Sequence, residues 1–268
     1  MTLIAILMGT LAAGIGSVWL AAFLSFGVLA RYNQHMLSLA AGALLATAFM
    51  HLLPEAFESQ ASARDLFATL LVGLVFFFLL DKAELWHHGH EHGGGHAPDP
   101  GHDHGAVHDH GHHHSHEGKS GGWTVLAGDS VHAFGDGILI ASAFMADLRL
   151  GVVAALAVLV HEVPHHMGDL VVLRQTSNNR RVALIKVSLA GAVTALGGII
   201  GYALVDQLYD YLPFFLIMAS SSFIYVALAD LIPQLQKRVT ARETAAQIAW
   251  LGIGIGMVTL ISAIAHHH

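Results

Sequence analysis

The sequence has no cysteine in its 268 residues and few charged residues. The missing thiols exclude disulfides and thiolate metal sites, so any bound metal ion must be held by nitrogen and oxygen atoms. Charged residues make up 12% of the chain, compared with about 25% in ordinary soluble domains. Together with a hydrophobic content of 54%, this scarcity of charge indicates an integral membrane protein.

Long apolar runs dominate the chain, and each is close to the roughly 20 residues that cross about 30 Å of hydrocarbon. Backbone groups in lipid must be satisfied internally, so runs of this length predict helices. The first run lacks a basic leader and is too long for a signal-peptide core, so we expect it to be retained. The sequence therefore predicts an all-α membrane protein with eight transmembrane helices, at residues 3–29, 34–56, 64–86, 123–145, 150–173, 182–205, 211–235 and 244–265.

The basic residues predict how these helices are oriented. Of the twelve Lys and Arg residues, only Arg64 and Arg149 lie outside one set of alternate connections. Because cytoplasmic connections collect basic residues, both termini are expected outside the cytoplasm, in a multi-pass protein of the cell (inner or plasma) membrane.

A short internal similarity relates the second and seventh helices. His51-Leu-Leu-Pro-Glu55 resembles Asp230-Leu-Ile-Pro-Gln234, although five residues can also agree by chance. The two helices run in opposite directions, and inverted repeats of this kind place the substrate sites of many transporters near the midplane. We therefore predict a 3+2+3 inverted-repeat bundle.

A polar segment separates the third and fourth helices. Residues 87–122 contain thirteen histidines and many glycines, a composition typical of disordered metal-binding tracts. A solvated linker whose histidines bind metal incidentally is the alternative. The chain thus divides into helices 1–3 (residues 1–86), a cytoplasmic His-rich loop (87–122), helices 4–5 with a metal site (123–174), helices 6–8 (182–265) and a tag remnant (266–268).

Ionisable residues interrupt the fourth and fifth helices, where they typically mark a substrate or ion path. Residues four apart share a helix face, so His132 and Asp136 form one column, and His161, His165 and Asp169 form another. Antiparallel packing predicts His132 level with His165, and Asp136 level with His161. Three imidazoles and one carboxylate suit a tetrahedral Zn²⁺ site, although Fe²⁺, Mn²⁺ and Cd²⁺ accept the same ligand atoms.

Other polar residues have weaker assignments. Glu162 is expected as a direct ligand, a bridge to a second ion, or an acceptor for an imidazole N–H. His166 points to another face and is expected to be structural. We expect nearby Gly135, Gly137 and Gly168 to allow close helix packing. The expected entry or exit path, whose members also admit purely structural roles, comprises His51, Glu55, Asp129, Asp169 and Asp230.

Two motifs resemble those of the ZIP family of zinc and iron transporters. His132-Ala-Phe-Gly-Asp136-Gly137 resembles the family's fourth-helix HNxxDG motif, and His161-Glu-Val-Pro-His165-His-Met-Gly-Asp169 resembles HExPHxxGD of the fifth. The resemblance implies metal movement into the cytoplasm, with His132, Asp136, His161 and His165 as the primary site. It also implies an elevator-like motion of helices one, four, five and six against the others, often within a homodimer.

One position departs from the family pattern. Ala133 replaces the usual Asn, which helps to hold a second central ion together with a carboxylate on the sixth helix in family members with two metals. The sixth helix offers only Ser188 and Thr194 there. We therefore predict a single central metal ion, with Glu162 as its outer partner.

Two other functions fit parts of the sequence. The run from His161 to His165 satisfies HExxH, the zinc-protease motif, but Pro164 is awkward within it and four protein ligands would exclude a catalytic water. Cation-diffusion-type exporters also use His-x-x-x-Asp pairs, but they normally have six helices and a soluble C-terminal domain. The predicted partners are therefore divalent metal ions and the lipid bilayer, with no nucleic acid and no enzymatic activity.

Overall fold

The computed structural model describes residues 1–25, 33–89, 121–176, 179–236 and 240–265. Most of the predicted His-rich loop and the C-terminal triplet lie outside these residues. The described parts of the chain are helical throughout, with short turns and no strand. In chain order the α-helices are α1 (Thr2–Leu11), α2 (Ser17–Ser25), α3 (Asn33–Thr47), α4 (Leu53–Phe57), α5 (Ala63–Gly89), α6 (Gly121–Ala146), α7 (Leu148–Thr176), α8 (Arg180–Gln207), α9 (Leu212–Tyr225), α10 (Ile232–Leu235) and α11 (Ala241–Ala265).

Four shorter helical segments complete the fold. Three are π-helical, η1 (Ala12–Gly16), η3 (Ala48–Leu52) and η5 (Val226–Leu231), and η4 (Tyr209–Tyr211) is a 3₁₀ turn. Each π segment continues directly into neighbouring α-helix, so α1 to α2, α3 to α4 and α9 to α10 form three long rods.

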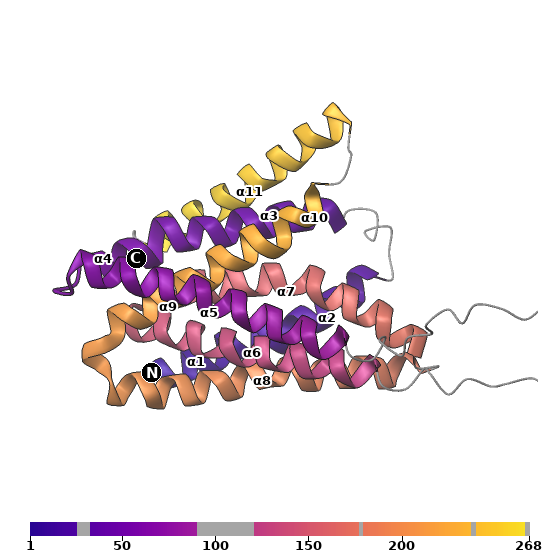
Figure 1. Ribbon diagram of the computed structural model, residues 1–268, viewed down its shortest axis with the longest axis horizontal. Helices are drawn as coiled ribbons and strands as arrows, with labels where there is room; N and C mark the ends of the chain where they lie inside the picture. Colours follow the sequence, from indigo (N-terminus) through magenta and orange to yellow (C-terminus); the bar gives the residue numbers. More distant parts are fainter. Residues whose placement is uncertain (26–32, 90–120, 177–178, 237–239, 266–268) are drawn as a thin grey trace, which may run out of the picture.

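Seven helical segments of the described chain are long and apolar enough to cross a membrane, which fits a multi-pass membrane protein. The helix α6 is as long, at 26 residues, but it is not among the seven. Asp129, His132 and Asp136 lie within it and lower its mean hydropathy. The eighth crossing therefore stays a prediction, although α1 begins and α11 ends at the same end of the bundle, as an even number of crossings requires (Figure 1).

Two groups of helices can be distinguished by their packing. The rod of α1 and α2 packs with α6, α7 and α8, whereas α3 packs on α11 and α5 packs on α9 (Figure 1). The groups meet where α3 lies against α7 and where α6 lies against α9. The helices α6 and α7, which carry the predicted ligands, therefore belong to one group and face the other.

Glycine allows the closest of these contacts. A side-chain carbon on Gly137 of α6 would collide with the backbone of Thr194 in α8, and one on Gly197 of α8 would collide with the backbone of Phe134. The prediction of close packing is confirmed for Gly137. It is wrong for Gly135 and Gly168, because a side-chain carbon added to either would meet open space, with no such atom within 4 Å.

The two segments of the internal similarity share an unusual backbone feature. His51 is the next-to-last residue of η3, and Asp230 is the next-to-last residue of η5. Both η3 and η5 are followed by a short α-helix with a proline, Pro54 or Pro233, in its first turn, whereas η1 continues into α2 without one. The π turn before a proline is therefore a structural likeness that accompanies the sequence similarity, and the inverted repeat stays a prediction.

Candidate metal centre

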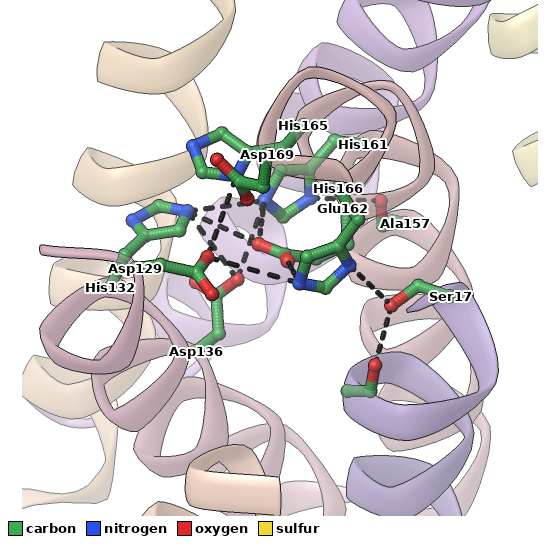
Figure 2. Close-up of polar contacts among 11 residues, drawn as sticks. Ser17, Asp129, His132, Asp136, Ala157, His161, Glu162, His165, His166 and Asp169 are labelled. Carbon is green, nitrogen blue, oxygen red and sulfur yellow. Dashed lines mark hydrogen bonds and ion pairs between the residues drawn. The ribbon is translucent and has the colours of Figure 1, made fainter. Parts of the chain in front are cut away.

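The helices α6 and α7 bring four of the predicted residues together in the interior of the bundle. His132 and Asp136 project from α6, and His161 and Glu162 project from α7, with one ligand atom of each within 4.8 Å of all the others. Asp136, His161 and Glu162 are buried, whereas the His132 side chain is 29% exposed. Figure 2 shows the carboxylates and imidazoles of this central cluster converging on one point.

The spacing of these atoms matches a tetrahedral metal site. His161 Nε2 lies 3.3 Å from Asp136 Oδ2 and 3.4 Å from Glu162 Oε1. His132 Nε2 lies 3.4 Å from Glu162 Oε1, 3.7 Å from Asp136 Oδ2 and 3.4 Å from His161 Nε2. Zinc bonds of 2.0–2.1 Å place tetrahedral ligand atoms about 3.4 Å apart. The central cluster therefore has the dimensions of a Zn²⁺ coordination shell.

A backbone carbonyl orients the His161 ring for this purpose. His161 Nδ1 lies 3.2 Å from the Ala157 carbonyl oxygen, one turn back along α7. A carbonyl only accepts, so Nδ1 carries the proton and Nε2 presents its lone pair to the cluster. Metal-binding histidines are commonly fixed in this way.

His165 does not join the central cluster, which departs from the predicted ligand set. Its Nδ1 lies 3.3 Å from Asp169 Oδ2 and 3.5 Å from Asp129 Oδ1, and these three residues form a second group. The predicted level is right, since the His132 and His165 rings stack with centroids 5.9 Å apart. Two carboxylates turn the His165 ring away, and Glu162 takes the fourth position.

His166, which sequence reasoning treated as structural, is fully buried beside Glu162 and Asp129 in a third group. Its Nε2 lies 3.2 Å from Glu162 Oε2. The spacing of four residues between Glu162 and His166 was a signal in the sequence that could have indicated this contact.

A cavity of about 550 Å³ extends from the central cluster towards the end of the bundle where α5 ends and α6 begins. Tyr225 donates a hydrogen bond of 3.0 Å to Asp81 at its wall. Among the described residues no Lys or Arg lines it, so its electrostatics favour cations. The ionisable acidic and histidine residues that line it are Asp81, Asp129, Asp169, Asp230, His132, His161 and His165.

The remaining predicted path residues lie apart from the metal-ligand groups of the described chain. Asp230 lines the cavity and accepts a hydrogen bond of 2.9 Å from Gln234. His51 lies 3.5 Å from Ser262 Oγ of α11, and Glu55 is exposed on α4. The structure therefore joins Asp230 to the cavity, but not His51 or Glu55.

Comparison with known proteins gives the family. Residues 1–262 match the family described as ZIP zinc transporter. The chain belongs to the ZIP zinc transporter family. Zinc transporter ZIP13 of Pongo abelii is 27% identical over 97% of this chain and 79% of its own length.

Other ZIP relatives match over smaller parts. Zinc transporter ZIP10 of Danio rerio is 33% identical over 54% of this chain, and zinc transporter ZIP4 of Homo sapiens is 29% identical over 76% of it. This chain spans only 18% of the ZIP10 protein and 39% of the ZIP4 protein. The ZIP assignment confirms the resemblance seen in the two motifs, and the relatives are transporters rather than enzymes.

Proposed function

We propose that the protein transports divalent metal ions, with Zn²⁺ as the principal substrate, across the membrane into the cytoplasm. The observation that carries this proposal is the central cluster of His132, Asp136, His161 and Glu162, whose ligand atoms have tetrahedral spacing. Two carboxylates balance the charge of one divalent ion. That balance lowers the cost of holding the ion in a poorly hydrated interior.

The cavity supports release to the cytoplasmic side. It connects the central cluster to Asp230 and Asp81 at the end of the bundle, where the excess of Lys and Arg predicts the cytoplasm. On the opposite side α6 is closed in by buried apolar residues, including Ile140 and Leu139. This arrangement corresponds to an inward-facing state, with His165, Asp129 and Asp169 as the next ligands along the exit.

The packing of the helices is compatible with an elevator motion. The group of α1, α2, α6, α7 and α8 carries the complete central cluster, so it can move as a unit against α3, α5, α9 and α11 without breaking the site. We propose that this movement alternates access between the two sides. Assembly as a homodimer stays a prediction from the family.

The protease and exporter alternatives are not favoured. A metalloprotease needs its Glu free as a general base, but Glu162 Oε1 lies 3.4 Å from both His132 and His161 within the ligand set. The family match is to ZIP transporters, not to cation-diffusion-type exporters.

Metal uptake into liposomes that contain the purified protein tests the proposal. Radiolabelled Zn²⁺ should accumulate faster than in protein-free liposomes, and competition with Fe²⁺, Mn²⁺ and Cd²⁺ should rank the ions that the nitrogen and oxygen ligands accept. His161→Ala should lower uptake at least about tenfold, because even outer-shell ligand partners contribute that much to metal affinity. Equal uptake with and without protein, or unchanged uptake by His161→Ala, would refute the proposed function.

A further inference from the structure

The buried His166 ring links α2 to one of the ligands of the central cluster. Its Nδ1 lies 3.0 Å from Ser17 Oγ at the start of α2, and its Nε2 lies 3.2 Å from Glu162 Oε2 on α7. Ser17 and His166 have no exposed surface, so water does not compete for these contacts. Polar contacts therefore run without interruption from α2 to Glu162 (Figure 2).

The Ser17 hydroxyl can support the form of the His166 ring that attracts Glu162. Ser17 Oγ lies 2.6 Å from the Gly14 carbonyl oxygen as well as 3.0 Å from His166 Nδ1, and hydroxyl protons rotate to suit their acceptors. A neutral imidazole with its proton on Nε2 turns a positive N–H towards Glu162, and its bare Nδ1 accepts from Ser17. Nε2 is not aligned for a hydrogen bond, so the attraction is electrostatic, and burial strengthens it.

Close packing holds Ser17 in place beside α7. A side-chain carbon on Gly14, one turn earlier, would collide with the backbone of α8. Val18 and Met167, the sequence neighbours of Ser17 and His166, belong to one buried apolar cluster. The ring is therefore held by its surroundings and cannot follow a carboxylate that rotates away from it.

Glu162 divides its two oxygens between the central cluster and His166. Oε1 lies 3.4 Å from both His132 Nε2 and His161 Nε2, whereas Oε2 lies beside His166. A carboxylate held in this way offers one oxygen to an ion in the cluster. With one oxygen from Asp136 and two imidazole nitrogens, the ion has four ligand atoms, the number that Zn²⁺ prefers.

A Glu162 carboxylate without this restraint could turn and bind the same ion through both oxygens. The second oxygen would add a fifth ligand atom to the central cluster. Carboxylate oxygens and higher coordination numbers suit Mn²⁺ better than Zn²⁺. The contact with His166 therefore bears on which ion the site accepts.

We propose that Ser17 and His166 set the metal selectivity of the central cluster, by holding Glu162 to a single ligand oxygen and so favouring Zn²⁺ over Mn²⁺. Both are positioning residues, because neither belongs to the central cluster itself. The inference rests on the proposed function and deepens it.

Competition between Mn²⁺ and Zn²⁺ for uptake into liposomes that contain the full chain tests the proposal. The measured quantity is the selectivity ratio, the inhibition constant of Mn²⁺ divided by the KM for Zn²⁺. Ser17→Ala removes only the hydroxyl, and the ratio should fall about tenfold, the lower end of what partners of metal ligands contribute to affinity. Ser220→Ala is the matched control, because Ser220 is equally buried but bonds to the Leu216 carbonyl oxygen of its own helix. It should keep the wild-type ratio.

Two amide variants of His166 separate positioning from packing. In His166→Gln the amide nitrogen reaches the place of Nε2 beside Glu162, whereas in His166→Asn it reaches only the place of Nδ1 beside Ser17. His166→Asn should lower the selectivity ratio about tenfold, and His166→Gln should restore part of it. A role in packing alone would change the amount of active protein, and hence the maximal rate, but not the ratio.

A wild-type selectivity ratio in Ser17→Ala or in His166→Asn would overturn the inference and leave the proposed function intact. So would a crystal structure of the wild-type protein with Zn²⁺ in which Glu162 binds one ion through both oxygens, a result that needs no variant to fold. No Zn²⁺ uptake by the wild-type protein would refute the proposed function and this inference together.

Discussion

At the residue scale, the orientation of each imidazole decides what it can bind. The Ala157 carbonyl and the Ser17 hydroxyl hold His161 and His166 so that Nε2 faces Glu162. His165 turns its Nδ1 to Asp169 instead. His132 and His161 therefore belong to the central cluster, and His165 belongs to the group with Asp129 and Asp169. His166 is buried beside Glu162.

The two imidazoles of the central cluster make metal uptake sensitive to acid. Histidine binds metal only when its ligand nitrogen is unprotonated, so protons compete with Zn²⁺. Uptake should be complete above the imidazole range, near about pH 6.5, and should fall steeply below it. Zinc uptake measured between neutral pH and about pH 5, with identical buffer on both sides, checks this, and a flat profile would argue against histidine ligation.

Part of this site could be predicted from the sequence. The spacing of four residues correctly placed His132 with Asp136 and set both columns at the right level. It could not predict that Glu162, rather than His165, joins the central cluster, because that outcome depends on competing carboxylates and on side-chain rotation. The role of Ser17 was equally hidden, since it lies 149 positions from His166 and meets it only through the packing of α2 on α7.

At the scale of helices, the contact of α6 with α8 positions the ligands. Gly137 follows the ligand Asp136 and lies directly on the backbone of α8, whereas Gly135 has open space around it. The two glycines are two residues apart on the same helix, so they form a matched pair for testing this contact.

Gly137→Ala should destabilise the protein by about 1–3 kcal/mol, the usual cost of overpacking, and should weaken zinc binding by moving Asp136. Gly135→Ala should be neutral or slightly stabilising, because alanine favours helix over glycine by about 1 kcal/mol. Thermal unfolding of both variants in the same detergent checks the difference. Equal melting temperatures would show that the α6 to α8 contact is looser than described.

The helix boundaries were predictable because lipid imposes length and hydropathy. The predicted helix at 34–56, for example, corresponds to the span Gln34–Phe57. The π segments η3 and η5 were not predictable, since hydropathy carries no information about the register of backbone hydrogen bonds. The similarity between His51–Glu55 and Asp230–Gln234 overlaps both segments, but it predicted a repeat and not a π-helical backbone.

At the scale of the whole molecule, the absence of cysteine makes topology measurable. Single cysteines in place of Gln60 and Gln236, both exposed and at opposite ends of the bundle, should label differently with a membrane-impermeant maleimide. The distribution of Lys and Arg predicts labelling of Gln60→Cys in intact cells and of Gln236→Cys only after permeabilisation. The reverse pattern would invert the proposed direction of transport.

The central claim is that the transported ion passes through the cluster of His132, Asp136, His161 and Glu162. Zinc uptake by Asp136→Asn tests it most directly, because the change removes a ligand charge at constant size. Asp210→Asn, an exposed position in η4, is the matched control. We predict an initial rate at least about tenfold lower for Asp136→Asn and a wild-type rate for the control, whereas a wild-type rate for Asp136→Asn would contradict the account.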